Sequence, residues 1–476
     1  MPARKRGKRS PDKRVPNEAT PKRLSVNSED EVYLALSGLA VILSLFKAPL
    51  QPINDPALFE FFGRAMLHGQ RLYLDLHDNK PPSIYLVNEL WQALFGANYF
   101  LHNCAEAAVN LASIALFGLT LRRLRVTAWA QGTFLFALFF SLPFPQFDFT
   151  QHYAVFFIVL GLYLHFRGAD FWAGVALVAA STFWIPAALT CIPIFAQGLE
   201  RRRAIAFAAG FGGVLLAGGI AVLALFTRDL VNILPAVWAH YLQVSIDYNL
   251  RKLDSTFALS AMIPSILFLL ALLLVAVRKP VGQTSRFALT WSGCALAGSF
   301  IPPNFYEHYY LPSIPALAMA IASFGLTAKD VARRPIVAII AAALLVLAVR
   351  QSMATMNAAQ ADAGYVQRIG TWIRSSLKDR PTVYTFEYYP DIQFASDSRI
   401  AGGGWRSNQP IPDVVVAGPV DIPEKIRRHE LMQFTWGMKK KRTTLMYVPV
   451  CPLLLSYPIA LYVRADEAAE FRCDKL

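Results

Sequence analysis

The sequence has few charged residues for its length. Asp, Glu, Lys and Arg make up 16% of the 476 residues, and apolar residues make up 55%. A soluble domain carries roughly 25% charged and 45–50% apolar residues. The apolar excess also comes in blocks of membrane-spanning length, which a water-soluble core does not need. The composition therefore argues against a soluble protein and predicts a chain that crosses a membrane several times.

Cysteine is scarce as well, with five residues in the chain. Cys104, Cys191 and Cys294 lie in apolar blocks, and we expect them to be small core residues. Cys451 and Cys473 can pair only if the C-terminal region faces an oxidising compartment. Because there is no Cys-x-x-Cys and no Cys/His cluster, the sequence does not indicate a zinc site.

Acidic residues are fewer than basic ones, and the formal net charge is +14. Much of the excess lies in the first 23 residues, and most of the rest lies in short runs beside apolar blocks. This is the pattern of the cytoplasmic flanks of spanning helices. A cytoplasmic tail on anionic lipid explains it better than nucleic-acid binding. No short apolar region follows the tail directly, so we expect no cleavable signal peptide.

Eleven apolar blocks are predicted to span the membrane. They cover approximately 32–50, 100–121, 129–142, 153–166, 171–183, 186–196, 205–226, 257–277, 287–301, 310–326 and 336–349. Prolines interrupt 171–196, which favours two short helices over one long one. The block 81–95 starts with two prolines and is short for a span, so we expect an interfacial or re-entrant helix there.

The basic runs determine the predicted orientation. The runs 122–125, 201–203, 278–279 and 333–334 share the side of the N-terminal tail only if 81–95 does not cross. We therefore predict an α-helical polytopic membrane protein with a cytoplasmic N-terminus and an extracytoplasmic C-terminus. Its expected parts are a basic tail (1–30), a transmembrane module (31–350) with its first outer loop at 51–99, and a C-terminal domain (351–476).

The C-terminal region is less apolar and is predicted to be a small α/β domain. A helical pattern covers 365–377, and short apolar runs at 382–386, 413–418 and 444–448 are typical of buried strands. The region contains no recognisable catalytic motif. In the predicted topology, ionisable residues such as Asp148 and His308 gather at the outer face among aromatics and prolines. Such groups are expensive at a bilayer edge unless they line a watered cavity, so we expect the chemistry there rather than merely solvated loops.

The first outer loop holds the most informative motif. Asp55 follows the first span, a helical segment ends in Met66-Leu67-His68-Gly69, and Asp78-Asn79-Lys80-Pro81-Pro82 comes next. In this order the motifs resemble those of membrane glycosyltransferases of the GT-C fold, in the branch of protein O-mannosyltransferases and the lipid A aminoarabinose transferase. FYEHYYLPSIPALA (305–318) resembles a later segment of that branch, and the 384–400 region followed by PDVVV (412–416) resembles its distal domain.

The resemblance implies a polyprenyl-phosphate-linked sugar donor, used outside the cytoplasm of a bacterium at its inner membrane. Transfer needs a base for the acceptor proton and a cation for the departing phosphate. Asp55 is the candidate base, and its alternative role is to cap the helix 56–67. Lys80 is the candidate phosphate ligand, and its alternative is snorkelling at the interface. With a single base candidate, we expect an inverting displacement.

Further residues are assigned to the substrate. Asp148 is expected to position the acceptor or tune the pKa of Asp55, and the resemblance implies an acidic residue in its region. The remaining candidates for the donor phosphate or sugar are Asp78, His152, Glu307, His308 and Tyr309. For the last three, a hydrogen-bonded helix start is an equal alternative.

No metal ligand is assigned. Asn54 stands where many relatives carry a second acid, which argues against a two-carboxylate metal site. Asp75, His77 and Asp78 leave a divalent cation open as a cofactor, although their spacing defines no site. Within the span 100–121, Asn103, Glu106 and Asn110 form one stripe that is expected to join helices or line a pocket.

Two other functions stay open. A secondary transporter would place its binding residues near the midplane and often shows internal repeats, whereas the polar residues here lie at the outer face and no repeat is visible. A lipid-linked glycan ligase or polymerase is the third alternative. The expected partners are a polyprenyl-phosphate sugar, a lipid, polysaccharide or protein acceptor, and membrane lipids, with no nucleic acid.

Overall fold

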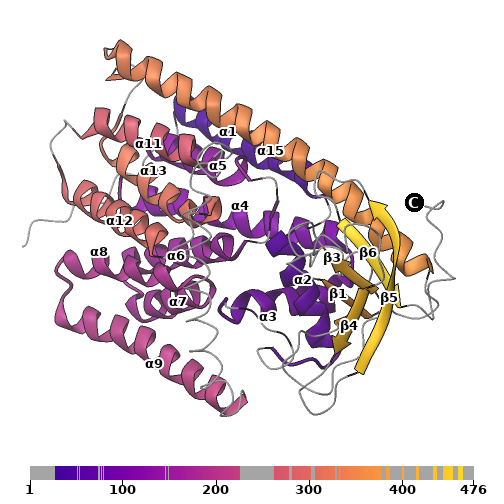
Figure 1. Cartoon of the computed structure of the whole chain (residues 1–476). Coiled ribbons are helices and arrows are strands. Elements are labelled where there is room, and N and C mark those ends of the chain that lie inside the picture. The colour runs from indigo at the N-terminus through magenta and orange to yellow at the C-terminus, as the bar shows by residue number, and fades with distance from the viewer. Residues whose placement is uncertain are drawn as a thin grey trace, which may run out of the picture.

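The structure, a computed structural model, is a helical bundle with strands at its C-terminal end (Figure 1). It describes residues 27–50, 52, 54–72, 76, 78, 80–144, 146–147, 149–225, 262–277, 281–301, 306–326, 330–331 and 333–376, and the strand segments 382–385, 399–400, 414–417, 432–436, 443–453 and 459–464.

The first half of the bundle runs from α1 to α9. Its elements are α1 (Ser28–Ser44), η1 (Leu45–Lys47), α2 (Asn54–Leu67), α3 (Ser83–Phe95), α4 (Tyr99–Arg123), α5 (Trp129–Ser141), α6 (Thr150–Phe166), α7 (Asp170–Phe183), η2 (Ile185–Thr190), α8 (Cys191–Ala196) and α9 (Arg201–Leu225). The predicted break within 171–196 is confirmed: α7 ends at Phe183, Trp184 is extended, and Pro186 enters the next helical turn.

The second half consists of α11 (Met262–Ala276), α12 (Gln283–Phe300), η3 (Glu307–Tyr310), α13 (Ser313–Ser323) and α15 (Pro335–Ser376). The prediction of two separate helices at 336–349 and 365–377 is wrong, because both ranges belong to α15, which is continuous over 42 residues. The segment between them is polar, but it is rich in Ala and Gln and contains no proline, and its single glycine, Gly364, does not end the helix. Figure 1 shows α15 running along the bundle and on to the strands.

The outer surfaces of several helices are apolar. Leu215, Leu216 and Ile220 of α9 and Ile336 and Ile339 of α15 are more than half exposed. Among the described residues, three helices are long and apolar enough to cross a membrane, namely Tyr99–Arg123, Arg201–Ile220 and Pro335–Asn357, and further apolar helices are shorter. Contiguous exposed apolar surface of this kind suits lipid rather than water. The number of spans stays a prediction.

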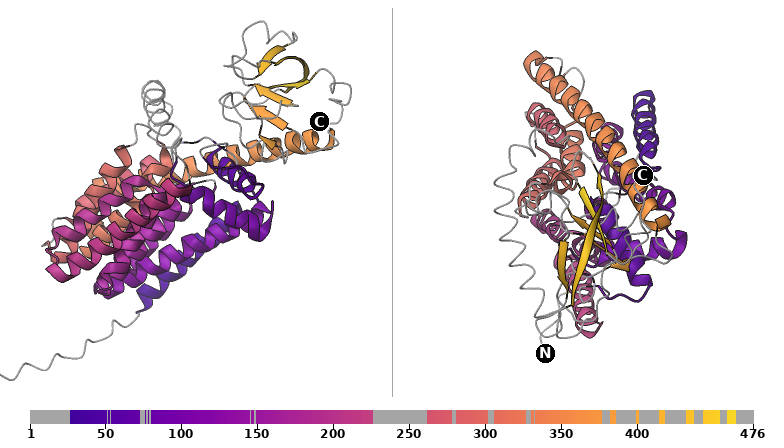
Figure 2. Two further views of the ribbon diagram at one scale, coloured as in Figure 1. Left: turned by 90° about the horizontal axis from the view of Figure 1, so that it is seen from below. Right: turned by 45° about the vertical axis from the view of Figure 1, so that its right-hand side comes forward.

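The described strands form one six-stranded sheet in the order β2-β1-β3-β6-β5-β4. The strands are β1 (Thr382–Thr385), β2 (Arg399–Ile400), β3 (Val414–Ala417), β4 (Met432–Trp436), β5 (Thr443–Leu453) and β6 (Ile459–Arg464). β1 pairs in parallel with β2 and β3, and the other pairs are antiparallel. The three apolar runs predicted as strands correspond to β1, β3 and β5. Figure 2 shows the sheet beside the far end of α15, beyond the bundle.

The packing of α2 on α3 determines the position of the first outer loop. Phe59 and Phe62 of α2 contact the ring of Tyr85 of α3 at centroid distances of 5.8 and 5.4 Å. At Gly63 a Cβ atom would lie 2.5 Å from the carbonyl carbon of Asn88, so the two backbones touch where the helices cross. Only glycine permits this approach.

We predict that Gly63→Val separates α2 from α3 and lowers the melting temperature by several degrees, because overpacking at a tight contact costs about 1–3 kcal/mol. Thermal unfolding of the purified protein in detergent measures the shift. Gly213→Val on α9 is the control, since a Cβ atom there meets nothing within 4 Å. Equal melting temperatures for the two variants would contradict the tight crossing.

Candidate functional site

Three charged side chains of the first outer loop meet near the N-terminal ends of α2 and α3. Asp55 lies in the first turn of α2, and its carboxylate is 3.2 Å from the ammonium group of Lys80. Asp78 lies 3.7 Å from the same ammonium group. Because α2 starts at Asn54, Asp55 lies inside the helix rather than at its cap, where its charge still suits the helix N-terminus. The structure thus brings together the predicted base and phosphate ligand.

Aromatic packing holds Lys80 in place. Its ammonium group lies 5.1 Å from the centroid of the Phe59 ring. Pro81 and Pro82 lead directly into α3, and the Tyr85 hydroxyl in the first turn of that helix donates a hydrogen bond back to Asp78. These contacts hold the segment that contains Asp78 and Lys80, and they keep the ammonium group near the N-terminal ends of α2 and α3.

The charge balance of this cluster favours an ionised Asp55. Burial raises the pKa of this carboxyl group, but the charge of Lys80, His308 and the hydrogen bond to Lys80 lower it, and the net pKa lies below its usual value. The Asp55 and Lys80 side chains are 29% and 21% exposed, so small molecules can reach them. A carboxylate beside an ammonium group can accept a proton from an alcohol or phosphate acceptor while the ammonium group binds an anion.

His308 forms one wall of the site. Its ring is stacked between Phe149, at 4.8 Å, and Tyr306, at 5.5 Å, and it meets Tyr309 edge-on at 4.7 Å. Burial and the charge of Lys80 lower the pKa of His308 to about 4, although Asp55 raises it, so the ring is neutral at pH 7. The Tyr309 carbonyl accepts a hydrogen bond from Ser299, which ties this turn to α12. Glu307 lies half-buried in the same turn.

His152 lies deeper, near the start of α6. Rings of Phe140, Phe144 and Phe149 surround it at 5.2–6.1 Å. It is 2% exposed, and its Nδ1 atom has no hydrogen-bond partner among the described residues. Phe149 therefore separates His152 from His308, and the two histidines belong to one aromatic array.

Other predicted residues fall elsewhere. Asp148, Asp75 and His77 lie outside the described residues, as do Cys473 and its proposed pairing with Cys451. Within the part of the chain that the structure describes, no three His, Cys, Asp or Glu side chains are grouped as a metal site.

The polar stripe of α4 joins helices, as predicted. Asn103 donates to the carbonyls of Ala48 and Leu50, and Glu106 accepts a hydrogen bond from Trp91 of α3 at 3.0 Å. These contacts tie the segment after η1 and the helix α3 to α4.

The sequence interpretation missed two buried charged groups. Glu60 of α2 lies 3.0 Å from His102, and both are buried. Lys47 is buried at the end of η1, where its ammonium group donates to the Ser141 carbonyl. Lys47 stands alone inside an apolar block, and an ionisable residue in such a block is by itself a signal of function. No comparable local signal marks Glu60, whose partner lies 42 residues away.

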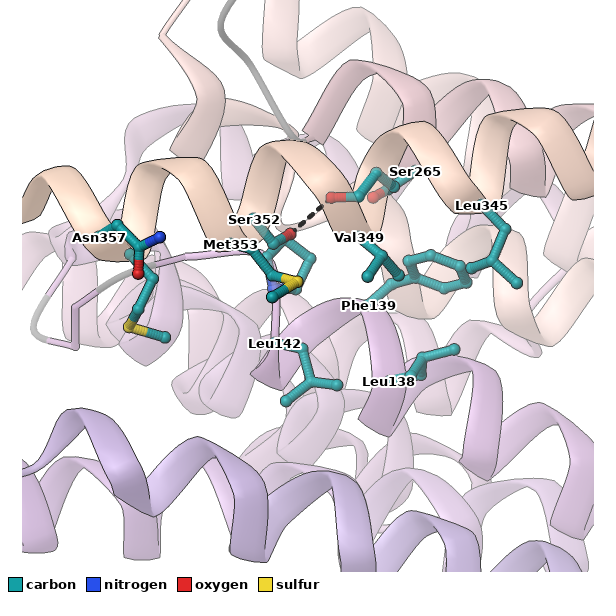
Figure 3. Close-up of a pocket in the computed structure, with 12 residues that line it drawn as sticks. Leu138, Phe139, Leu142, Ser265, Leu345, Val349, Ser352, Met353 and Asn357 are labelled. Carbon is teal, nitrogen blue, oxygen red and sulfur yellow. Dashed lines mark hydrogen bonds between the residues drawn. The ribbon is translucent and has the colours of Figure 1, made fainter.

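A separate cavity lies between α5, α11 and α15. This cavity of about 310 Å³ is lined mainly by apolar side chains, among them Leu138, Leu142, Val349 and Met353, with Ser265 and Ser352 as polar exceptions. Figure 3 shows the α5 leucines facing the side chains of α15. One lining residue, Pro143, directly precedes Phe144, whose ring contacts His152.

Comparisons with known proteins give a fold and no family. The chain superposes on the crystal structure of ArnT from Cupriavidus metallidurans bound to undecaprenyl phosphate with a TM-score of 0.57 and 13% identity, over 93% of this chain and 99% of that one. The apo crystal structure of the same protein gives a TM-score of 0.49 at 13% identity over the same shares. No protein-family model and no curated protein matches the sequence. The fold is therefore that of ArnT.

We predict a measurable coupling between Asp55 and Lys80. A double-mutant cycle of Asp55→Asn and Lys80→Met, followed by thermal unfolding, should give at most about 1 kcal/mol at pH 7, because the pair is partly exposed. Since the folded-state pKa of Asp55 is lowered, the coupling is present above the pKa of about 3.9 of an unfolded Asp and disappears as the pH falls through the lowered pKa. Independent effects of the two substitutions at pH 7 would refute the pairing.

Proposed function

We propose that the protein is a membrane glycosyltransferase that moves a hexosyl or pentosyl group from a polyprenyl-phosphate-linked donor to an extracytoplasmic lipid, polysaccharide or protein acceptor. The observation that carries this proposal is the contact between Asp55 and Lys80 near the N-terminal ends of α2 and α3. A base and a cation 3.2 Å apart provide the two groups that this transfer requires. The shared fold with a protein crystallised with undecaprenyl phosphate supports the choice of donor.

The proposed reaction is a single displacement. The acceptor oxygen forms a bond to the anomeric carbon of the sugar, and its proton passes to the Asp55 carboxylate. The bond between the anomeric carbon and the phosphate oxygen breaks, and its electron pair leaves with the prenyl phosphate. The configuration at the anomeric carbon is therefore inverted. Asp148 is proposed to position the acceptor, and His308, Glu307, Tyr309, Asp78 and His152 to surround the donor.

The position of Lys80 suggests how donor binding prepares the base. The Lys80 ammonium group lies within 4 Å of both Asp55, at 3.2 Å, and Asp78, at 3.7 Å. A donor phosphate that attracts this group weakens its contact with Asp55. Because Lys80 lowers the pKa of Asp55, the carboxyl group then becomes more basic. A stronger base is thus produced only when the donor is bound.

The apolar cavity is proposed to hold part of the prenyl chain. Its walls are formed by α5, α11 and α15, and its lining residue Pro143 directly precedes Phe144 of the array around His152. A lipid chain placed there would have its phosphate directed toward the charged cluster. A transporter would instead place its polar site near the midplane of the bundle.

The proposed location is the bacterial inner membrane. The basic runs favour a cytoplasmic N-terminus and eleven spans, with α3 at the interface. The sheet beyond α15 is then a periplasmic α/β domain, and the site faces the periplasm. Whether a divalent cation takes part stays open.

The kinetic test compares Asp55→Asn with Lys80→Ala. The first removes the base, and we expect kcat to fall by about 10²–10⁴-fold with expression preserved. The second removes a charge that meets the phosphate in both ground and transition states, so donor KM should rise and kcat should also fall. Initial rates with a synthetic prenyl phosphosugar measure both effects.

Asp170→Asn is the matched control for this test. Asp170 also lies in the first turn of a helix and pairs with a cation, Arg203 at 2.6 Å, but at the other end of the bundle. Its turnover should be close to that of wild type. Near-wild-type turnover by Asp55→Asn would remove this residue from catalysis, and the site would have to be rebuilt around Asp148.

We further predict that Ser352→Phe raises the KM for a long-chain prenyl donor, because the new ring fills the cavity. A donor with two isoprene units should be affected little. Ser375→Phe serves as the control, since Ser375 lies exposed on the same helix. An equal loss for both donor lengths would argue against the cavity as a chain site.

A further inference from the structure

Lys47 is a buried lysine without a carboxylate partner among the described residues. Its side chain is 2% exposed, it donates to the Ser141 carbonyl, and its ammonium group lies 5.8 Å from the Phe147 ring centroid. No Asp or Glu oxygen of the described residues forms an ion pair with it. An unpaired buried ammonium group is costly, whereas methionine would fit the same place at no electrostatic penalty. Within the part of the chain that the structure describes, the contacts of Lys47 therefore do not offset the cost of burying its charge.

Lys47 is linked to the candidate site through the aromatic array. Lys47 donates to the Ser141 carbonyl, and the ring of the neighbouring Phe140 contacts His152, which belongs with His308 to the aromatic array. Phe149 contacts both histidines, and His308 in turn lies within the electrostatic influence of Asp55 and Lys80. The path between Lys47 and the charged cluster is buried and aromatic, so the field of Lys47 is screened far less than it would be in water.

The charged cluster alone is poorly suited to an anion. Asp55 and Asp78 carry two negative charges and Lys80 carries one positive charge, so the three side chains sum to −1. His308 is neutral at pH 7 and does not change this sum. The proposed donor brings a phosphodiester with one negative charge, and the departing prenyl phosphate carries up to two. A further positive charge is needed nearby.

We propose that Lys47 supplies this charge and acts as the electrostatic counter-charge of the phosphate site. It offsets the excess carboxylate of the Asp55–Asp78–Lys80 cluster from behind the His152–Phe149–His308 array. Its role is to position the phosphate by its field, and contact with the substrate is not required. The inference rests on the proposed function, because it assumes that the anion is a prenyl phosphate.

The experiment measures the binding of undecaprenyl phosphate to the full-length protein in nanodiscs, with uncharged undecaprenol as the second ligand. Lys47→Met should weaken binding of the phosphate about tenfold and leave undecaprenol binding unchanged, while Lys47→Arg should bind like wild type. Without ligand, Lys47→Met should melt at the same temperature as wild type or higher, because the unpaired charge is gone. A purely structural lysine would give a lower melting temperature instead.

Two further variants make the test specific. Arg123→Met is the matched control, because Arg123 also donates to a helix carbonyl, that of Phe166, but near the opposite end of the bundle. Its affinity for undecaprenyl phosphate should not change. Asp78→Asn in the Lys47→Met background restores the charge sum of the site, and it should recover most of the lost affinity.

The possible results distinguish a failure of the Lys47 proposal from a failure of the proposed function. If wild type binds undecaprenyl phosphate and Lys47→Met binds it equally well, Lys47 is not the counter-charge and the proposed function stands. Lys47 is likewise excluded as the counter-charge if Asp78→Asn recovers nothing or if undecaprenol binding falls in parallel. If wild type does not bind undecaprenyl phosphate, the proposed function and the inference both fail. Should Lys47→Met not fold, Lys47→Gln takes its place with the same expectations.

Discussion

The crossing of α2 over α3 is the contact on which the candidate site depends. Asp55 begins one helix and Lys80 precedes the other, so the angle and separation of the helices determine whether the two charges meet. Gly63 lets the backbones touch, and the Phe59 and Tyr85 rings fill the space beside it. An ion pair that is partly exposed contributes too little to fix such a geometry by itself. The apolar packing between α2 and α3 therefore brings Asp55 and Lys80 together, and the ion pair forms as a result.

The packing around Lys80 affects how the site can bind an anion. A lysine held by packing does not lose its place when its ion pair is broken, so its ammonium group can turn from Asp55 toward an incoming anion. The hydrogen bond from Tyr85 keeps Asp78 in position on the other side. The cluster can then exchange one negative partner for another without refolding, as a site that binds and releases a phosphate in every cycle requires.

The sequence predicted the parts of this site that are local. Asp55 and Lys80 are predicted because both lie in the motifs that resemble those of GT-C glycosyltransferases, and because the transfer needs a base and a cation. Lys47 was missed because hydropathy averaged over a block hides one charge among many apolar neighbours. Its partner, the Ser141 carbonyl, is known only once α5 is placed against the end of the first helix. The sequence also predicts two helices in place of α15, because a fall in hydropathy resembles a helix end even where no proline interrupts the helix.

The position of α3 determines where Lys80, which precedes this helix, lies. One face of α3 presents Leu86, Leu90 and Leu94, each at least half exposed, at the spacing of successive turns. The other face is fixed by Trp91, which donates to Glu106 of α4. Between helices in lipid the hydrophobic effect is weak, and polar contacts of this kind supply much of the specificity. The exposed leucine face and the polar contacts to α4, α6 and α7 thus determine the position of α3, and with it the position of Lys80.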